Sequence, residues 1–330
     1  MFLAILLASL PLIAAGGAVA TVIAIPALRR KLPRARRLPG SSRPDTAARV
    51  VVGTTSAALI LFTVPIVMPI VYRGLGYRVG DHWWWRYADV LILSCLAMFV
   101  VAILLACYRR RPDEPVAPTH PRTWRSFTTA TQLWTLSVSV VALLLLVAFA
   151  GSASSPDEDG RYRMLEIETG GVSGAITTFF GWAYGLPVAG VVAVLVALTV
   201  TALHLNAARP FLKSTTAPDE EVSRSTLSAL LVWFTVGAVL VTLGRSMHMV
   251  SSAAALSLTT EGYTWATTLA ALSPWLYWVA LLVQSVAYVV LGLVIAVACL
   301  RHEAGALPTR PAPDGAEVVA PKDRGSSTYG

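Results

Sequence analysis

Long runs of apolar residues alternate with polar segments along the whole chain. Seven runs are long enough to cross a membrane: 3–28, 50–72, 88–108, 128–150, 181–205, 226–248 and 275–300. A transmembrane helix needs about 20 mostly apolar residues. The hydrocarbon core offers no water to backbone polar groups, so each run must satisfy its own hydrogen bonds as a helix. The pattern predicts an all-α, polytopic bundle with seven transmembrane helices.

The composition agrees with a membrane setting. The 330 residues are 55% hydrophobic and 13% charged, whereas soluble domains carry about 25% charged residues. The basic residues behind the net charge of +8 flank the apolar runs, which favours an anionic lipid surface over nucleic acid as the partner. Alanine, valine and leucine are abundant and arginine is much preferred to lysine, as in GC-rich bacteria, and this favours the plasma membrane.

The distribution of basic residues predicts the orientation. Most of the 26 lysines and arginines lie in the segments after the first, third, fifth and seventh runs. The others are Arg73, Arg78, Arg86, Arg161, Arg163 and Arg245. Because cytoplasmic loops are enriched in Lys and Arg, the N-terminus is predicted outside and the C-terminus in the cytoplasm.

The two ends of the chain are interpreted separately. The letters "GGAVA" in the first run are typical of a signal-peptidase site, but no basic residue precedes the run, so a retained first helix is favoured. Residues 306–330 are rich in Pro, Gly, Ser and charge, and such a segment cannot bury enough apolar surface to fold. We expect a transmembrane domain over 1–305 and a disordered cytoplasmic tail over 306–330.

A weak internal repeat suggests one leading helix followed by three hairpins. The motif Trp-x-Tyr opens the third, fifth and seventh runs, at 85–87, 182–184 and 275–277. An arginine opens the run that precedes each of them, at Arg49, Arg125 and Arg224. Triplication of a hairpin would produce this pattern, as in transporters with parallel repeats. Convergence would also produce it, since Trp and Tyr favour membrane interfaces and Arg favours the cytoplasmic side.

Few ionisable or strongly polar side chains fall within the runs, and each is a candidate ligand-binding residue. Asp89 opens the third run, Arg245 and His248 lie near the outer end of the sixth, and Gln284 lies within the seventh. Arg245 and His248 are three residues apart and share a helical face. An outer polar cluster with Asp89 is one hypothesis; the other is that Arg245 extends to the headgroups and His248 is interfacial.

Two further features of the runs bear on chemistry. Pro65 and Pro69 share a face of the second run, and each frees a backbone carbonyl, so we expect a helix kink there. None of the five histidines pairs with another at ligand spacing, and Cys95, Cys107 and Cys299 lie in or beside apolar runs. We therefore expect no metal, haem or other cofactor and no disulfide framework.

The outer segment 151–169 carries Asp157, Glu158, Asp159, Glu166 and Glu168. A solvated loop is the simpler interpretation, and a cation-attracting vestibule is the other. Their spacing does not match an EF-hand calcium loop.

Residues 170–181, "GGVSGAITTFFG", resemble the serine motif of the rhomboid intramembrane proteases. The resemblance implies Ser173 as a nucleophile and a histidine from another helix as its base, for which His248 is at a matching depth. It covers about a dozen residues. The third and fourth runs carry no His and Asn pair of the kind that serves the oxyanion in that family. A rhomboid-like protease is thus a remote alternative, and we expect the protein not to be an enzyme.

Two classes of function fit a chain of this kind. A small transporter or permease, or the membrane subunit of a transport complex, is favoured. The sequence has no Walker-type phosphate loop, so ATP coupling would require a separate ATPase chain. The alternative is a non-catalytic signalling or assembly subunit, which the scarcity of polar groups inside the runs favours.

Overall fold

The computed structural model describes residues 16–17, 87–107, 123–167, 175–209, 217–260 and 263–304. Within these ranges, five helices are long and apolar enough to cross a membrane. They are α4 (Asp89–Ala106), α5 (Ala130–Ser152), α6 (Trp182–Ala208), α7 (Ala217–Ala254) and α8 (Ser273–Ala304). The last five predicted runs are therefore confirmed as helices. The run 50–72 with Pro65 and Pro69, the tail 306–330 and all but residues 16–17 of the run 3–28 lie outside the described residues.

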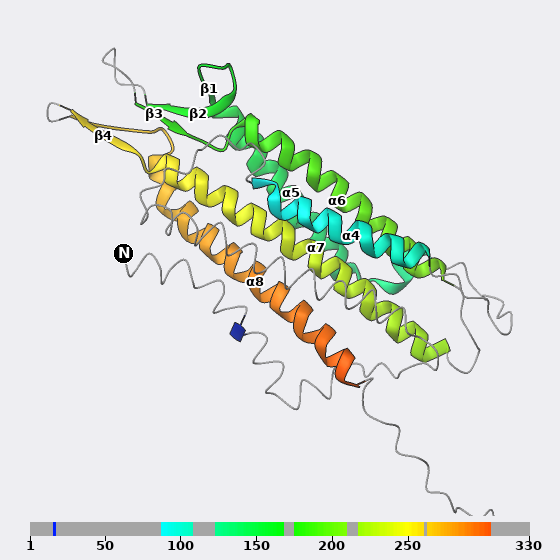
Figure 1. Cartoon of the computed structure of the whole chain (residues 1–330). Helices are drawn as coiled ribbons and strands as arrows, with labels where there is room; N and C mark the ends of the chain where they lie inside the picture. Colours follow the sequence, from blue (N-terminus) through cyan, green and yellow to red (C-terminus); the bar gives the residue numbers. More distant parts are fainter. Residues whose placement is uncertain are drawn as a thin grey trace, which may run out of the picture.

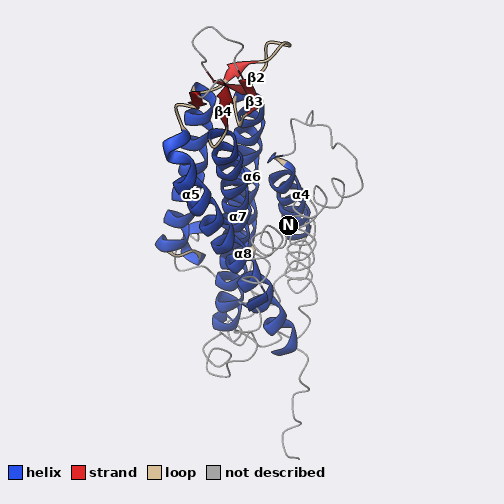
Figure 2. Cartoon of the chain, turned by 90° about the vertical axis from the view of Figure 1, so that its left-hand side faces the viewer, coloured by secondary structure: helices blue, strands red, loops and turns tan. Residues whose placement is uncertain are grey.

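The five helices run antiparallel in chain order. Helices α4, α6 and α8 begin at one end of the bundle, and α5 and α7 begin at the other (Figure 1). Two small sheets lie at the end where α6 and α8 begin (Figures 1 and 2). We call this the strand end, and the other the opposite end. Helix α7 contacts each of the other four helices and is the most buried of them.

Helix α7 is longer than the apolar run that predicts it. The predicted range 226–248 is too short at both ends, because the helix extends over Ala217–Ala254. The first two turns contain Glu220 and Arg224, which precede the predicted run in the sequence. Both side chains are buried and pair with each other at 3.4 Å. Two opposite charges four residues apart stabilise a helix. The charged residues before the apolar run therefore do not mark the start of α7.

A reciprocal cap fixes the start of α5. The Gln132 backbone N–H donates to Thr129 Oγ1 at 3.3 Å, and the Thr129 N–H donates to Gln132 Oε1 at 3.0 Å. This capping box satisfies two of the donors that a helix start leaves without partners. The first turn of α5 is thereby held next to the short helix η2 (Trp124–Phe127).

The structure adds two antiparallel sheets that the all-α prediction omitted. Strands β1 (Ser155–Pro156), β2 (Tyr162–Ile167) and β3 (Ala175–Thr178) form one sheet between α5 and α6. Strands β4 (Ser257–Thr260) and β5 (Tyr263–Ala266) form a hairpin between α7 and α8. In β2, Leu165 and Ile167 are buried and Glu166 is exposed, which is the period-two pattern of a half-buried strand.

The turn from β1 to β2 uses part of the acidic segment for its own structure. Asp157 Oδ1 accepts the N–H groups of Asp159 and Arg161, and Arg163 pairs with the Asp157 carboxylate. Burial opposes ionisation of Asp157, but these hydrogen bonds outweigh it and hold the pKa of Asp157 below its ordinary value. Gly160 has a φ of 75°, which glycine adopts without strain. Asp157 is therefore a turn-forming residue, which weakens the vestibule interpretation.

Helices α7 and α8 approach closely along small residues spaced seven apart on α7. A Cβ on Gly237 would lie 2.6 Å from Leu291 Cδ2, and a Cβ on Gly244 would lie 3.1 Å from the Ala280 carbonyl oxygen. Seven residues after Gly244, Ser251 of α7 lies against Ser273 of α8. Each serine hydroxyl donates a hydrogen bond to the other residue's carbonyl oxygen, at 2.9 and 3.0 Å. Small residues let backbones approach in this way in membrane helix pairs.

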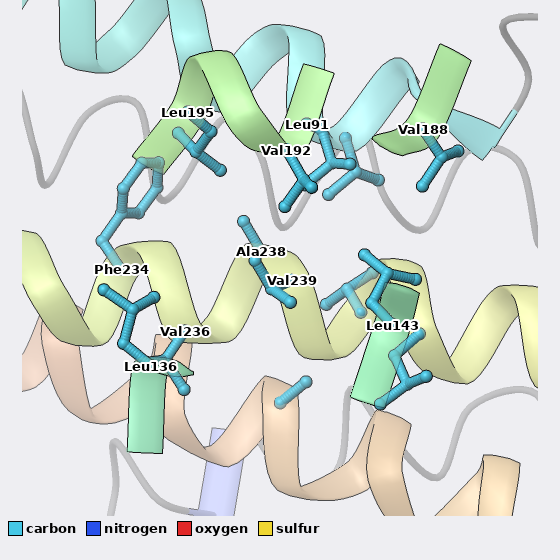
Figure 3. Close-up of a cluster of buried hydrophobic side chains, with 14 of the residues drawn as sticks. Leu91, Leu136, Leu143, Val188, Val192, Leu195, Phe234, Val236, Ala238 and Val239 are labelled. Atoms are coloured by element: carbon cyan, nitrogen blue, oxygen red, sulfur yellow. The ribbon is translucent and has the colours of Figure 1, made fainter. Parts of the chain in front are cut away.

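Apolar side chains from four helices meet around α7 (Figure 3). Leu91 comes from α4, Leu143 from α5 and Val192 from α6, and they face Ala238 and Val239 of α7. Each of these five is at most 1% exposed. Tight packing on every side fixes the orientation of α7, and thereby the positions of the polar side chains that it carries.

Candidate functional site

The structure brings two of the predicted site residues into contact at the strand end. Arg245 Nη1 lies 2.7 Å from Asp89 Oδ1, which joins α7 to the first residue of α4. The two side chains are 11% and 31% exposed. The hypothesis of an outer polar cluster thus has a structural basis, while ligand binding by this pair stays a prediction.

Aromatic rings surround this ion pair. The Arg245 guanidinium carbon lies 6.0 Å from the centre of the Tyr87 ring, and Tyr87 meets Phe180 and Tyr184 edge to face at 5.4 Å. Tyr184 also hydrogen-bonds the side chain of Arg163 in β2. A continuous set of contacts therefore runs from the first sheet to the ion pair. Rings that exclude water strengthen the attraction between the two charges.

His248 and Gln284 lie at the contact between α7 and α8. The His248 ring centre is 5.4 Å from that of Tyr277 in α8, and the His248 side chain is exposed. Gln284 packs beside Gly244, with its Cγ 2.5 Å from where a Cβ on that glycine would lie. In the described part of the chain, no hydrogen bond joins either residue to Asp89 or Arg245. The four candidates therefore separate into an ion pair and two residues of a helix–helix contact.

A row of buried hydroxyl groups follows one face of α7. Ser228, Thr235, Thr242 and Ser246 are spaced by seven, seven and four residues and are at most 1% exposed. Such spacing places them on a single face of a helix. Thr235 Oγ1 lies 2.9 Å from Thr199 Oγ1 of α6. We call these five residues the polar seam.

Most hydroxyls of the polar seam bond within the bundle. Thr235 and Thr242 donate to the carbonyl oxygens of Leu231 and Ala238, one turn earlier. Ser246 Oγ has no hydrogen-bond partner among the described residues, although its side chain is fully buried. An unsatisfied buried hydroxyl is unfavourable by about 1–3 kcal/mol, so Ser246 is the least satisfied position of the seam.

A buried charged cluster closes the seam at the opposite end. Asn206 Nδ2 donates to Ser228 Oγ at 2.9 Å and to the Arg224 carbonyl oxygen at 3.0 Å, while Arg209 bonds Asn206 Oδ1. Arg224 pairs with Glu220. All four polar residues of this arginine cluster (Asn206, Arg209, Glu220 and Arg224) are at most 8% exposed. The seam therefore has an ion pair at each end.

Sequence reasoning missed both the polar seam and the arginine cluster. It counted Arg209 and Arg224 among the basic residues of a cytoplasmic loop, and it did not consider the Ser and Thr residues within the runs. The seven-residue spacing of Ser228, Thr235 and Thr242 was a usable signal, because repeated polar residues on one helical face mark a buried or solvated stripe.

The remaining chemical hypotheses receive no support from geometry. Within the described ranges, no group of three His, Cys, Asp or Glu side chains could hold a metal ion. Ser173 lies outside the described residues, and so does Glu168.

Comparison with known proteins yields no relative. No family model matches the chain, no curated protein matches it, and no solved structure is similar to it. Its function has to be inferred from the described side chains.

Proposed function

We propose that the chain is a multi-pass plasma-membrane protein that acts as a small transporter or as the membrane subunit of a transport complex. In this proposal seven helices cross the membrane, the N-terminus is outside and the C-terminus is cytoplasmic. The polar seam is the path along which a small polar solute moves. If ATP drives the movement, a separate ATPase chain supplies it.

One observation supports this proposal: the polar seam lies along α7 between an ion pair at the strand end and an ion pair at the opposite end. Polar and charged groups within a span are unfavourable in lipid and are usually retained for function. A path closed by interhelical polar contacts at both ends is suited to alternate opening, because the contacts at one end can separate while those at the other hold. The Asp89–Arg245 pair, which joins α4 to α7, would then act as one gate, and the bonds from Asn206 of α6 to Arg224 and Ser228 of α7 would act as the other.

Accessibility of the seam to water tests the proposal without knowledge of the solute. Thr242→Cys is introduced after Cys95, Cys107 and Cys299 are changed to alanine, and intact vesicles are treated with a charged, membrane-impermeant thiol reagent. Val241→Cys is the matched control, since Val241 is the adjacent residue, is fully buried and lies off the seam. We expect modification of Thr242→Cys and not of Val241→Cys. Equal protection of both cysteines from both sides would contradict a solute path.

A non-catalytic assembly subunit is the second candidate, and it rests on the same hydroxyls. Thr199, Thr235 and Thr242 all bond within the bundle, as hydroxyls do when they join helices in a membrane. This candidate predicts a stoichiometric complex with another membrane protein after mild detergent extraction. It also predicts no reaction at Thr242→Cys, so one experiment separates the two candidates.

A further inference from the structure

A cavity of about 750 Å³ opens at the opposite end of the bundle. It lies between η2, the start of α5, and the facing sides of α7 and α8. Its α7 lining includes Thr226 and Trp233, whose spacing from Thr235 places them on the other side of α7 from the polar seam. The cavity is therefore separate from the proposed solute path, and the inference below does not depend on that proposal.

The lining of the cavity changes from polar to apolar with depth. Its mouth carries six side chains with hydroxyl or amide groups: Ser126, Thr128, Thr129, Gln132, Ser225 and Thr226. Its interior is formed by apolar side chains that include Leu230 and Trp233 of α7 and Val290 and Val294 of α8. From Ser225 to Trp233 the α7 wall is about 12 Å long, at 1.5 Å per residue. A narrow apolar slot below a polar mouth fits a hydrocarbon chain with a polar head.

A basic side chain, that of Arg125, lies next to the mouth in η2 without lining the cavity. Arg125 is exposed in η2, next to Ser126, and its guanidinium stacks over the Trp124 ring at 5.2 Å. In the described part of the chain, no carboxylate pairs with Arg125. The Gln132 side-chain oxygen is occupied by the α5 cap, which leaves its amide N–H groups to donate. These donors match an anionic head group.

We propose that this cavity binds an anionic glycerophospholipid. One acyl chain lies between α7 and α8 against Leu230, Trp233 and Val294. The phosphate lies at the mouth, where Arg125 and the Gln132 amide donate to its oxygens. Binding at this site differs from nonspecific contact with lipid, because it requires both an anionic head group and an unoccupied apolar slot.

Native mass spectrometry of the full-length protein in detergent tests this site, with phosphatidylglycerol and phosphatidylcholine as probes. Wild type is expected to retain phosphatidylglycerol preferentially. Arg125→Gln is expected to lower that preference about fivefold, which corresponds to one basic side chain near a lipid surface. Ala229→Phe fills the slot and is expected to abolish retention of both lipids. The controls are Arg161→Gln, an exposed arginine at the strand end, and Val194→Phe, on an exposed face of α6; both are expected to behave as wild type.

Two results would overturn the proposal: equal retention of both lipids by wild type, or undiminished retention by a folded Ala229→Phe. If Ala229→Phe does not fold, quenching of tryptophan fluorescence by brominated phosphatidylglycerol decides instead. The quenched fraction should fall in Trp233→Phe, because Trp233 lines the slot. Quenching that is unchanged in Trp233→Phe would overturn the proposal.

Discussion

Arg245 extends from the middle helix of the bundle to a carboxylate that opens another helix. Its pairing with Asp89 at 2.7 Å, beside the Tyr87 ring, places a charge pair where water has limited access. Exposed pairs contribute roughly 0–1 kcal/mol, whereas removing one partner of a buried pair costs about 3–5 kcal/mol. At 11% and 31% exposure, this pair lies between the two limits.

Breaking the pair should destabilise the strand end. We expect Arg245→Met or Asp89→Asn alone to lower the free energy of unfolding by about 1–3 kcal/mol, the range between exposed and buried pairs. The double variant should lose less than the sum of the two. Denaturant unfolding in detergent, analysed as a double-mutant cycle, measures the coupling. Arg161→Gln, which removes an exposed pair at 4.0 Å, is the control and should have little effect. Strict additivity would show that Asp89 and Arg245 do not interact.

For single residues, sequence reasoning succeeded where the position of a residue relative to the membrane surface decides which other residues it meets. Asp89 and Arg245 were grouped because both lie near the same membrane surface, and the structure joins them. It failed for Arg224, which was placed in a connection but is buried in α7 and pairs with Glu220 of the same helix. Such pairing cannot be inferred from charge and position alone.

Individual elements were predicted well when their signal was local. An apolar run of sufficient length identified each of the five described helices, since lipid permits no other backbone structure there. The sheets were missed because β1 and β3 are only two and four residues long. Their pairing with β2 depends on partners that sequence periodicity does not reveal. A two-stranded hairpin such as β4–β5 is only marginally stable by itself. Its position next to the helix bundle therefore stabilises the hairpin.

The approach of α7 to α8 predicts a contrast between two helical glycines. Gly244→Ala should destabilise the protein by about 1–3 kcal/mol, as expected for overpacking, because the new methyl group would lie against Gln284 and the Ala280 carbonyl oxygen. Gly190→Ala in α6 has nothing within 4 Å of its new Cβ. It should be neutral or stabilising by up to about 1 kcal/mol, since alanine favours a helix. Thermal unfolding of both variants in one detergent makes the comparison, and equal effects would contradict the close contact.

The two sheets lie at one end of the bundle (Figure 2). The arginine cluster lies at the other end, where α6 ends and α7 begins. Five antiparallel helices produce this division, because every second connection returns to the same end (Figure 1). The alternation was predicted from the apolar runs alone. Which end faces the cytoplasm depends on basic residues in the connections, many of which lie outside the described residues.

Labelling in intact cells tests the orientation of the molecule. In the same cysteine-free background, Glu158→Cys at the strand end should react with an impermeant maleimide, because the enrichment of basic residues at the other end predicts a cytoplasmic location there. Thr123→Cys, which precedes η2 at the opposite end, should react only after permeabilisation. Both positions are exposed in the structure. The reverse pattern of labelling would invert the proposed topology.

The polar partners of α7 have a consequence for how the chain is made. The most apolar 18-residue stretch of α7 is less hydrophobic than those of the other four helices, and α7 carries Arg224 and Arg245. Asp89, Thr199 and Asn206, which bond this helix, all precede it in the chain. The ribosome therefore synthesises these three polar partners before it synthesises α7. When α7 leaves the translocon, a polar surface formed by α4 and α6 is already in the bilayer to receive it.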